Sequence, residues 1–425
     1  MNYFYELKKN IKDKKVKIGI IGLGYVGLPL ALEFCKKNFK IIGFDIDKTK
    51  IKKLNNGFSY INHIQNKQLK IFKSGCFFTD NFKFIKNVDI IILCLPTPLK
   101  KKNEPDLSFI KKTFESIRKY LTIKQLIVLE SSTYPGSTRE FARTFLKRFR
   151  IGENFFLGYS PEREDPNNKS FKLSNIPKVV SGYSNNCLDL TSDLYSKILK
   201  KIVKVSNLET AEFVKLYENI YRSVNIALVN ELKKISNNLN LDIFEIIEAA
   251  KTKPFGFEAF YPGPGVGGHC IPVDPYYLSW VAKKNKINAN LINNAGRINS
   301  SMPNWIIKKI LKKIKPKKVL IIGVAYKKDL DDTREAPAID VINILKRKGI
   351  HVDYHDPFVK TLKSRKLKKI YYSKEITNKM LKQYDCSIII TSHSSINYNK
   401  ISKFSKIVFD TRNIYKNSSK KIIKI

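Results

Sequence analysis

The chain has 425 residues, too many for one compact core, and this length predicts two or three domains. Its hydrophobic fraction of 43% excludes a disordered chain, and no apolar run approaches the roughly 20 residues that span a bilayer. Lysine and arginine outnumber aspartate and glutamate by 79 to 37, a formal net charge of +42. The basic residues are spread over the whole chain, which indicates a bias of composition rather than a polyanion site. We therefore expect neither a nucleic acid nor a membrane as partner.

The cysteines and histidines argue for a reducing compartment and against a metal centre. The six cysteines lie far apart without a CxxC pair, which is typical of reduced thiols in the cytoplasm. The five histidines are scattered and form no cluster with metal-ligand spacing. Basic residues up to Lys17 precede an apolar stretch over 18–32, which resembles a signal peptide. Four glycines and a proline within that stretch favour a nucleotide-binding motif instead.

The first elements form a strand–helix–strand unit. A buried strand is predicted over 16–21, a helix over 28–37 and a second strand over 40–44. Helical patterns separate the strands that follow, and this alternation predicts a doubly wound parallel sheet. These further strands are expected over 88–95, 126–130 and 155–159.

One long helix is predicted from residue 207 to about 238, with Ser206 as its N-cap. Its apolar residues recur at spacings of three and four: Phe213, Leu216, Ile220, Val224, Leu228 and Leu232. At 1.5 Å per residue this helix would be roughly 45 Å long, which is more than one domain needs. We expect it to join domains and to pack against a second subunit, giving a homodimer or a larger homo-oligomer.

A second nucleotide-binding-like unit follows. Strands are predicted over 318–322, 351–354, 386–391 and 406–409, with a helix over 336–348. The expected fold class is therefore α/β, with two Rossmann-like doubly wound domains joined by a long central helix. The expected domains are a dinucleotide-binding domain over 1–205, a central region with the helix and a catalytic loop over 206–300, and a second Rossmann-like domain over 301–425.

The glycine-rich segment after the first strand predicts a dinucleotide site. Gly22 would make the tight turn, Gly24 would let the backbone approach a pyrophosphate, and Gly27 would allow close packing of helix and strand. Asp45 closes the next strand, where a carboxylate binds the adenosine ribose and repels a 2′-phosphate. This pattern favours NAD over NADP. A purely structural glycine turn is the alternative.

The segment 261–273 holds four glycines and three prolines, which excludes a regular helix or strand. Near its end, Cys270 is placed for nucleophilic chemistry, although a single loop cysteine is more often inert. Lys215 and Asn219 are four residues apart and lie on one face of the long helix. Thr133 and Glu162 each follow a strand end, where open α/β sheets bind ligands.

With these motifs in order, the chain resembles the UDP-glucose/GDP-mannose dehydrogenase family over nearly its full length. Its cysteine loop is most similar to the bacterial branch that acts as UDP-N-acetylglucosamine 6-dehydrogenase. The matching segments are 22–27, 95–98, 131–137, 160–162, 211–219, 265–270 and 327–337.

The resemblance implies a role for each matching residue. Cys270 would be the nucleophile, and Glu162 a substrate-contacting acid that acts as general base. The other expected catalytic residues support the thiol, order water or bind the oxyanion: Thr133, Lys215, Asn219 and Asp274. The expected cofactor contacts are Gly22, Gly24, Tyr25, Val26, Gly27, Asp45, Lys50, Thr97, Thr133 and Arg334. The expected substrate contacts are Glu162, Lys215, Asn219, Phe260, Tyr261, Gly263, Gly267 and Lys327.

The expected activity is the four-electron oxidation of the C6 alcohol of a UDP-N-acetylhexosamine, UDP-N-acetylglucosamine first, for surface-polysaccharide precursors. Cys270 would carry a thiohemiacetal and then a thioester, with the charge of Lys215 favouring its thiolate. Pro166 and Val273 stand where the UDP-glucose branch often has a glutamate and a lysine. UDP-glucose, UDP-N-acetylgalactosamine and UDP-N-acetylmannosamine stay open as alternatives.

Two other functions compete with this interpretation. A two-electron hydroxy-acid dehydrogenase shares the N-terminal fold, but it has no use for the cysteine loop or for a second α/β domain. A basic nucleic-acid-binding protein with a degenerate nucleotide fold would explain the charge. The complete glycine motif and Asp45 argue against the second alternative.

Overall fold

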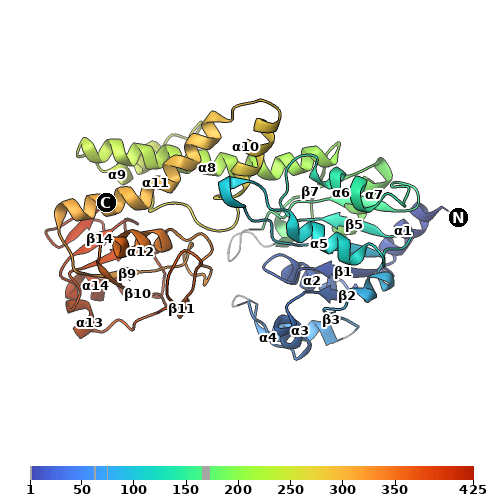
Figure 1. Cartoon of the computed structure of the whole chain (residues 1–425), viewed down its shortest axis with the longest axis horizontal. Coiled ribbons are helices and arrows are strands. Elements are labelled where there is room, and N and C mark those ends of the chain that lie inside the picture. The colour runs from blue at the N-terminus through green and yellow to red at the C-terminus, as the bar shows by residue number, and fades with distance from the viewer. Residues whose placement is uncertain (1, 62–63, 74, 165–172) are drawn as a thin grey trace. The chain divides into compact units, whose positions relative to one another are not determined.

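The computed structural model describes residues 2–61, 64–73, 75–164 and 173–425 (Figure 1). It divides into two units, one formed by residues 1–218 with 280–286 and the other by 219–279 with 287–425. The first division falls inside α8 (Leu208–Asn238), a helix of 31 residues, so both units contain part of it. The predicted long central helix is confirmed. The domain boundaries expected at 205 and 300 stay predictions.

In the described part of unit 1 the strands form one sheet in the order β3-β2-β1-β4-β5-β6-β7-β8. Adjacent strands from β3 to β6 are parallel, whereas β7 pairs antiparallel with β6. The central strands are continuous apolar runs because helices cover both faces of the sheet. The strands are β1 Lys17–Ile21, β2 Lys40–Phe44, β3 Phe77–Thr79, β4 Ile90–Leu93, β5 Leu126–Leu129, β6 Phe156–Tyr159, β7 Lys178–Gly182 and β8 Ile202–Lys204.

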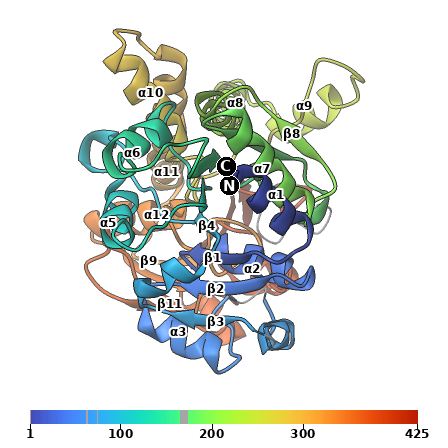
Figure 2. The same ribbon diagram turned by 90° about the vertical axis from the view of Figure 1, so that its right-hand side faces the viewer.

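Helices cover both faces of this sheet. Figure 2 shows α1, α2 and α7 on one face, where their apolar residues share a core with the strands, and α5 and α6 on the other. The first helix, α1, buries Phe4, Leu7 and Ile11, which recur at the helical spacing of three and four. The helices are α1 Tyr3–Lys12, α2 Gly27–Lys36, α3 Lys48–Asn55, α4 Asn66–Leu69, α5 Ser108–Ile117, α6 Ser137–Phe145 and α7 Asn185–Ser196.

The sheet of unit 2 has the order β10-β9-β13-β14-β15, and all of its neighbours are parallel. Alternate residues of β9 point into two cores: Val319 and Ile321 pack with α11 and α12, and Leu320 and Ile322 pack with α13 and α14. The strands are β9 Lys318–Ile322, β10 His351–His355, β13 Cys386–Ile389, β14 Val408–Asp410 and β15 Ile422–Lys424, with a separate antiparallel pair β11 Thr361–Leu362 and β12 Tyr371–Tyr372. The helices are α9 Ile243–Ala250, α11 Asn290–Lys313, α12 Pro337–Arg347, α13 Asn378–Lys382 and α14 Tyr398–Phe404, while α10 Asp274–Lys284 begins in unit 2 and ends in unit 1. The predicted pair of Rossmann-like domains is confirmed.

The start of α8 corrects one expectation. Asn207, not Ser206, caps the helix, because its Oδ1 accepts hydrogen bonds from the backbone N–H and the hydroxyl of Thr210, both at 2.8 Å. The helix begins at Leu208, so the residue with capping geometry is one position later than predicted. Among the helices of the described residues, none combines the length and the apolar character needed to cross a membrane.

Candidate active site

The glycine-rich loop between β1 and α2 has the geometry of a phosphate-binding turn. Gly22 has φ +93°, and a Cβ there would lie 2.3 Å from the carbonyl oxygen of Cys94. A Cβ at Gly27 would lie 2.0 Å from the carbonyl oxygen of Gly22, so helix and strand meet too closely for a side chain. A Cβ at Gly24, in contrast, would meet no atom within 4 Å. The backbone at Gly24 therefore faces open space, as the approach of a pyrophosphate requires. Tyr25 and Val26, the next expected cofactor contacts, are half-buried.

Asp45 connects the end of β2 to this loop. Its Oδ2 accepts a hydrogen bond from the backbone N–H of Leu23 at 3.0 Å and lies 3.2 Å from Nζ of Lys50. The hydroxyl of Tyr60 donates to the carbonyl of Leu23 and restrains the same turn. Two of the expected cofactor residues, Asp45 and Lys50, are thus in direct contact next to the loop.

The loop after β5 is held by a carboxylate that the sequence did not single out. Thr133 is fully buried, and its hydroxyl donates to Oε1 of Glu212 at 3.3 Å. Glu212, on α8, also accepts from the backbone N–H groups of Gly136 at 2.6 Å and Thr138 at 2.9 Å. Burial raises the pKa of Glu212, although these hydrogen bonds oppose the shift. Glu212 therefore joins the expected catalytic loop to the helix that carries Lys215, one turn further on. Thr97, another expected cofactor residue, is buried in the loop after β4.

Glu162 and Lys215 are in contact in unit 1. The ammonium of Lys215 donates to the main-chain carbonyl of Glu162. The carboxylate of Glu162 is turned away from this contact: Oε2 lies 3.0 Å from Nζ of Lys178, and Oε1 accepts the N–H groups of Arg163 and Glu164, both at 2.6 Å. The structure thus brings two expected catalytic residues together through the backbone. Pro166 lies outside the described residues.

In unit 2 the cysteine loop leads directly into α10. Residues 257–273 are neither helix nor strand, as predicted, and Cys270 is half-buried. The carbonyl of Cys270 accepts the N–H of Asp274 at 2.8 Å. The buried carboxylate of Asp274 in turn accepts a hydrogen bond from Nδ2 of the buried Asn219 at 2.6 Å. Three of the expected catalytic residues, Cys270, Asp274 and Asn219, are therefore connected in one hydrogen-bonded group.

The glycines of this loop lie against the segment that precedes α12. The N–H of Gly268 donates to the carbonyl of Arg334 at 2.9 Å, and a Cβ at Gly267 would lie 2.6 Å from Cβ of Tyr326. Lys327 follows Tyr326 directly and is half-buried. The guanidinium of Arg334 forms an ion pair with Asp332. The expected substrate residues Gly267 and Lys327 thus belong to one region of unit 2.

The start of the loop is anchored to α8 and α9. Phe260 packs in a cluster with Val229 and Phe244, and the hydroxyl of Tyr261 donates to Glu248 at 2.6 Å. At Gly263, a Cβ would lie 2.6 Å from a guanidinium nitrogen of Arg412.

Arg412, which lies against the expected substrate residue Gly263, is therefore a candidate substrate-binding residue that was not predicted from the sequence. Its Nε donates to the carbonyl of Ile390, and burial lowers the pKa of the guanidinium to about 10. The available signal was its position just after β14, at the carboxyl end of a strand.

Comparison with known proteins decides the family. Three models of the UDP-glucose/GDP-mannose dehydrogenase family match the chain: the NAD binding domain over residues 16–199, the central domain over 209–301 and the UDP binding domain over 320–417. The chain belongs to this family. It is an NAD-dependent UDP-sugar dehydrogenase, and its cofactor is NAD.

Two of the relatives similar in sequence are named for two different N-acetylhexosamine substrates. A UDP-N-acetyl-D-glucosamine 6-dehydrogenase of Pseudomonas aeruginosa is 37% identical over 81% of this chain and 84% of its own. A UDP-N-acetyl-D-mannosamine dehydrogenase of Pyrococcus horikoshii is 33% identical over 94% of this chain and 96% of its own. A solved structure of the UDP-N-acetyl-D-mannosamine dehydrogenase from Pyrococcus horikoshii has a TM-score of 0.87 at 32% identity, covering 96% of this chain and 99% of that one.

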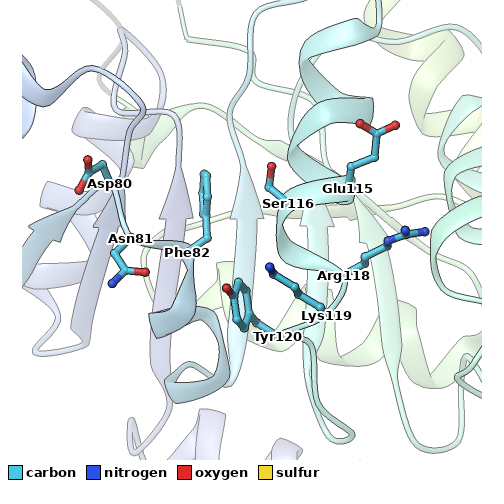
Figure 3. Close-up of a pocket in the computed structure, with 8 residues that line it drawn as sticks. All are labelled: Asp80, Asn81, Phe82, Glu115, Ser116, Arg118, Lys119 and Tyr120. Atoms are coloured by element: carbon cyan, nitrogen blue, oxygen red, sulfur yellow. The ribbon is translucent and has the colours of Figure 1, made fainter.

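A surface pocket of 550 Å³ in unit 1 does not belong to this site (Figure 3). It lies between the segment after β3 and the end of α5, and none of the expected catalytic, cofactor or substrate residues lines it. The lining residues are Asp80, Asn81, Phe82, Glu115, Ser116, Arg118, Lys119 and Tyr120. The dehydrogenase chemistry is therefore assigned from the loops described above.

Proposed function

We propose that this dehydrogenase oxidises the C6 primary alcohol of a UDP-N-acetylhexosamine, UDP-N-acetylglucosamine first, to the carboxylate in two successive steps. Relatives named UDP-N-acetyl-D-glucosamine 6-dehydrogenase, at 37% and 36% identity, support this substrate. The positions of Pro166 and Val273 argue against UDP-glucose. UDP-N-acetylmannosamine is the second candidate, because relatives with that name reach 33% identity.

The connection of Cys270 to Asn219 through Asp274 carries the proposal. NAD, held by the glycine-rich loop with Asp45 and Lys50, would supply the hydride acceptor for each oxidation. The Cys270 thiolate attacks the first product, an aldehyde, and forms a thiohemiacetal whose oxygen becomes negative as the bond forms. Asn219 lies in the same hydrogen-bonded group and supplies an N–H donor for that oxygen, an effect worth about 3 kcal/mol in comparable sites. The second oxidation gives a thioester, and water then releases the carboxylate and the thiol.

The remaining assignments follow from the two loops of unit 1. We assign Lys215 to the sugar and the oxyanion, because its ammonium is fixed by the Glu162 carbonyl. We assign Thr133, in the loop after β5, to ordering water or supporting the thiol. We assign Glu162, after β6, to contacting the substrate and acting as general base. We assign NAD contacts to the glycine-rich loop, Asp45, Lys50 and Thr97, and in unit 2 to Arg334.

The test is to incubate the purified protein with NAD and a panel of UDP-sugars and to count the NADH formed per sugar consumed. Two NADH per UDP-N-acetylhexosamine are expected. One NADH, with an aldehyde as end product, would contradict the four-electron reaction. The Cys270→Ala protein should form no net carboxylate, while the Cys76→Ala control should keep the ratio of two.

A stripe of exposed apolar side chains on α8 supports a homodimer. Tyr221, Leu228, Leu232 and Ile235 of α8, with Leu239 directly after it, recur at helical spacings and are each between 42% and 63% exposed. We propose that a second copy of the chain covers this stripe, since two identical apolar faces can pair about a two-fold axis.

Light scattering of the wild-type protein should give the mass of a dimer or a larger oligomer. Leu228→Glu should shift it to the monomer, whereas Leu291→Glu, an exposed leucine of α11, should not. A wild-type monomer would overturn the proposal.

We also propose a cytoplasmic location, a role in supplying surface-polysaccharide precursors, and the domain division 1–205, 206–300 and 301–425. The ranges of the three family models, 16–199, 209–301 and 320–417, support this division. Cell fractionation tests the location, and limited proteolysis tests the division through cuts near residues 205 and 300.

A further inference from the structure

A buried lysine with no expected role lies between two carboxylates in unit 1. The side chain of Lys178 is 2% exposed, and its Nζ lies 3.2 Å from Oε2 of Glu130 and 3.0 Å from Oε2 of Glu162. The hydroxyl of Tyr195 donates to the other carboxylate oxygen of Glu130. Removing an ammonium and two carboxylates from water is costly, and apolar residues of the same volume would often serve the fold equally well. This cost suggests a role beyond packing.

The sheet topology places this cluster at the edge of the sheet where the carboxyl ends of β5 and β6 lie. Glu130 directly follows β5, and Glu162 follows β6 by three residues. Because β7 is antiparallel to β6, with Tyr159 opposite Ser181, the same register carried three residues further sets Lys178 opposite Glu162. The three side chains therefore meet at the carboxyl ends of β5 and β6, where open α/β sheets bind their ligands.

Both oxygens of the Glu162 carboxylate are engaged in contacts. Its Oε1 accepts the N–H groups of Arg163 and Glu164, and its Oε2 binds Lys178. Burial alone would raise the pKa of Glu162, but the charge of Lys178 and these hydrogen bonds outweigh burial and lower it. The main-chain carbonyl of Glu162, in contrast, holds the ammonium of Lys215.

We propose that Lys178 is a positioning residue: by binding Glu130 and Glu162 it fixes the turn at residues 160–162, whose carbonyl orients the ammonium of Lys215. In this arrangement the Glu162 carboxylate anchors the turn. The proposal rests on the proposed function for the role of Lys215. The contact between Lys215 and Glu162 can be tested without turnover.

The first measurement follows Lys215 itself. Lysines are modified by reductive methylation, and the rate at each site is measured by peptide mass spectrometry. In the Lys178→Met protein, Lys215 should be methylated at least threefold faster than in the wild type. The matched control is Lys204→Met, which removes an exposed lysine from the adjacent strand β8 and should leave that rate unchanged.

The second measurement follows catalysis with the UDP-sugar that the panel identifies. Lys178→Met should lower kcat at least tenfold and leave the Kd for NADH within twofold, and Lys178→Arg should restore most of the activity. In a Lys215→Ala background the same change should have little further effect, whereas a merely structural role would lower kcat by the same factor in both backgrounds. If Lys178→Met does not fold, the double variant Lys178→Met/Glu130→Gln takes its place in both measurements, because it removes a cation and an anion together. The expected results are the same.

The outcomes separate the two proposals. An unchanged methylation rate of Lys215 in a folded Lys178 variant, or a kcat within twofold of the wild type, would overturn the positioning role. If Lys215 is methylated faster in the Lys178 variant, but none of the UDP-sugars of the panel supports the reduction of NAD by the wild type, the positioning role is retained and the proposed function is rejected.

Discussion

Asn219 of α8 donates a hydrogen bond from Nδ2 to Oδ2 of Asp274 at 2.6 Å. Both side chains are buried, and the N–H of Asp274 is bonded to the carbonyl of Cys270, four residues earlier. A carboxylate only accepts hydrogen bonds, so it fixes which end of the Asn219 amide faces it. Asp274 thereby sets the direction of an N–H donor relative to the turn that carries the nucleophile.

Asp274→Asn is predicted to lower kcat about a hundredfold, because an amide can pair with Asn219 in either orientation. The expected loss corresponds to about 3 kcal/mol of transition-state stabilisation. Steady-state kinetics with saturating NAD measure it, and Asp193→Asn on the surface of α7 is the control. A kcat within threefold of the wild type would show that Asp274 does not orient Asn219.

The central strands of both sheets could be predicted because buried parallel strands are continuous apolar runs. The ranges 40–44 and 318–322 agree with β2 and β9 residue for residue. The short edge strands β3, β8 and β15 and the antiparallel strand β7 were not predicted, since their pairing depends on partners distant in the chain. The helix α1 was missed as well, because its many lysines concealed the apolar spacing of Phe4, Leu7 and Ile11.

The motifs of the candidate site could be recognised in the sequence, but the contacts between its residues could not be predicted. Glycine loops, strand ends and the cysteine loop have local signatures, so Gly24, Asp45 and Cys270 could be proposed from the sequence. Lys178 lies in none of these segments, and the pattern of 211–219 does not set Glu212 apart from its neighbours. Each is a charged residue that normally lies in water, and only the fold shows that its partners surround it.

Asp45→Asn is predicted to weaken NAD binding and to reduce the preference for NAD over NADP. The carboxylate repels a 2′-phosphate and also holds the glycine-rich loop through the N–H of Leu23. The KM for NAD should rise at least tenfold. The ratio of kcat/KM for NAD and NADP measures the preference, with Asp80→Asn after β3 as control, and an unchanged ratio would contradict the role in selectivity.

The carboxyl of Glu130 should make stability depend on pH. Burial raises its pKa to about 7, although the charge of Lys178 opposes the shift. In the unfolded chain a glutamate has a pKa of about 4.3, so between these values the folded state keeps a proton that the unfolded state has lost. The contribution of Glu130 to stability is therefore present below about pH 4.3 and is lost as pH rises to 7. The neighbouring groups stay in one protonation state over this window, because the pKa of Glu162 is lowered and those of Lys178, Tyr195 and Cys94 are raised.

Urea unfolding at pH 5, 6, 7 and 8 tests this dependence. The free energy of unfolding of the wild type, minus that of Glu130→Gln, should fall with rising pH by up to about 1.4 kcal/mol per unit. Glu153→Gln, at an exposed site, should show no such trend. A difference that is flat with pH, or that rises, would mean that Glu130 is ionised throughout.

Glu212→Ala should destabilise the protein by about 3 kcal/mol, because it leaves the half-buried donor of Gly136 and the buried donors of Ser137 and Thr138 without their acceptor. Glu212→Gln keeps a carbonyl and should cost less. Glu209→Ala, one turn earlier on α8, removes a partly exposed ion pair with Arg139 and should cost less than about 1 kcal/mol. Equal losses at positions 209 and 212 would show that burial of the Glu212 network adds nothing.

Gly22 and Gly24 are two residues apart and should respond in opposite ways to the same substitution. Gly22→Ala forces a Cβ to within 2.3 Å of a backbone oxygen at φ +93°, so the protein without cofactor should lose stability by 2 kcal/mol or more, on the order of other strained sites. Gly24→Ala meets no protein atom within 4 Å, so its thermal midpoint without cofactor should stay close to that of the wild type. The added methyl would occupy the space for the pyrophosphate, and the Kd for NADH, measured by fluorescence titration, should rise at least tenfold. A Gly24→Ala protein that binds NADH as tightly as the wild type would show that the pyrophosphate does not lie against this residue.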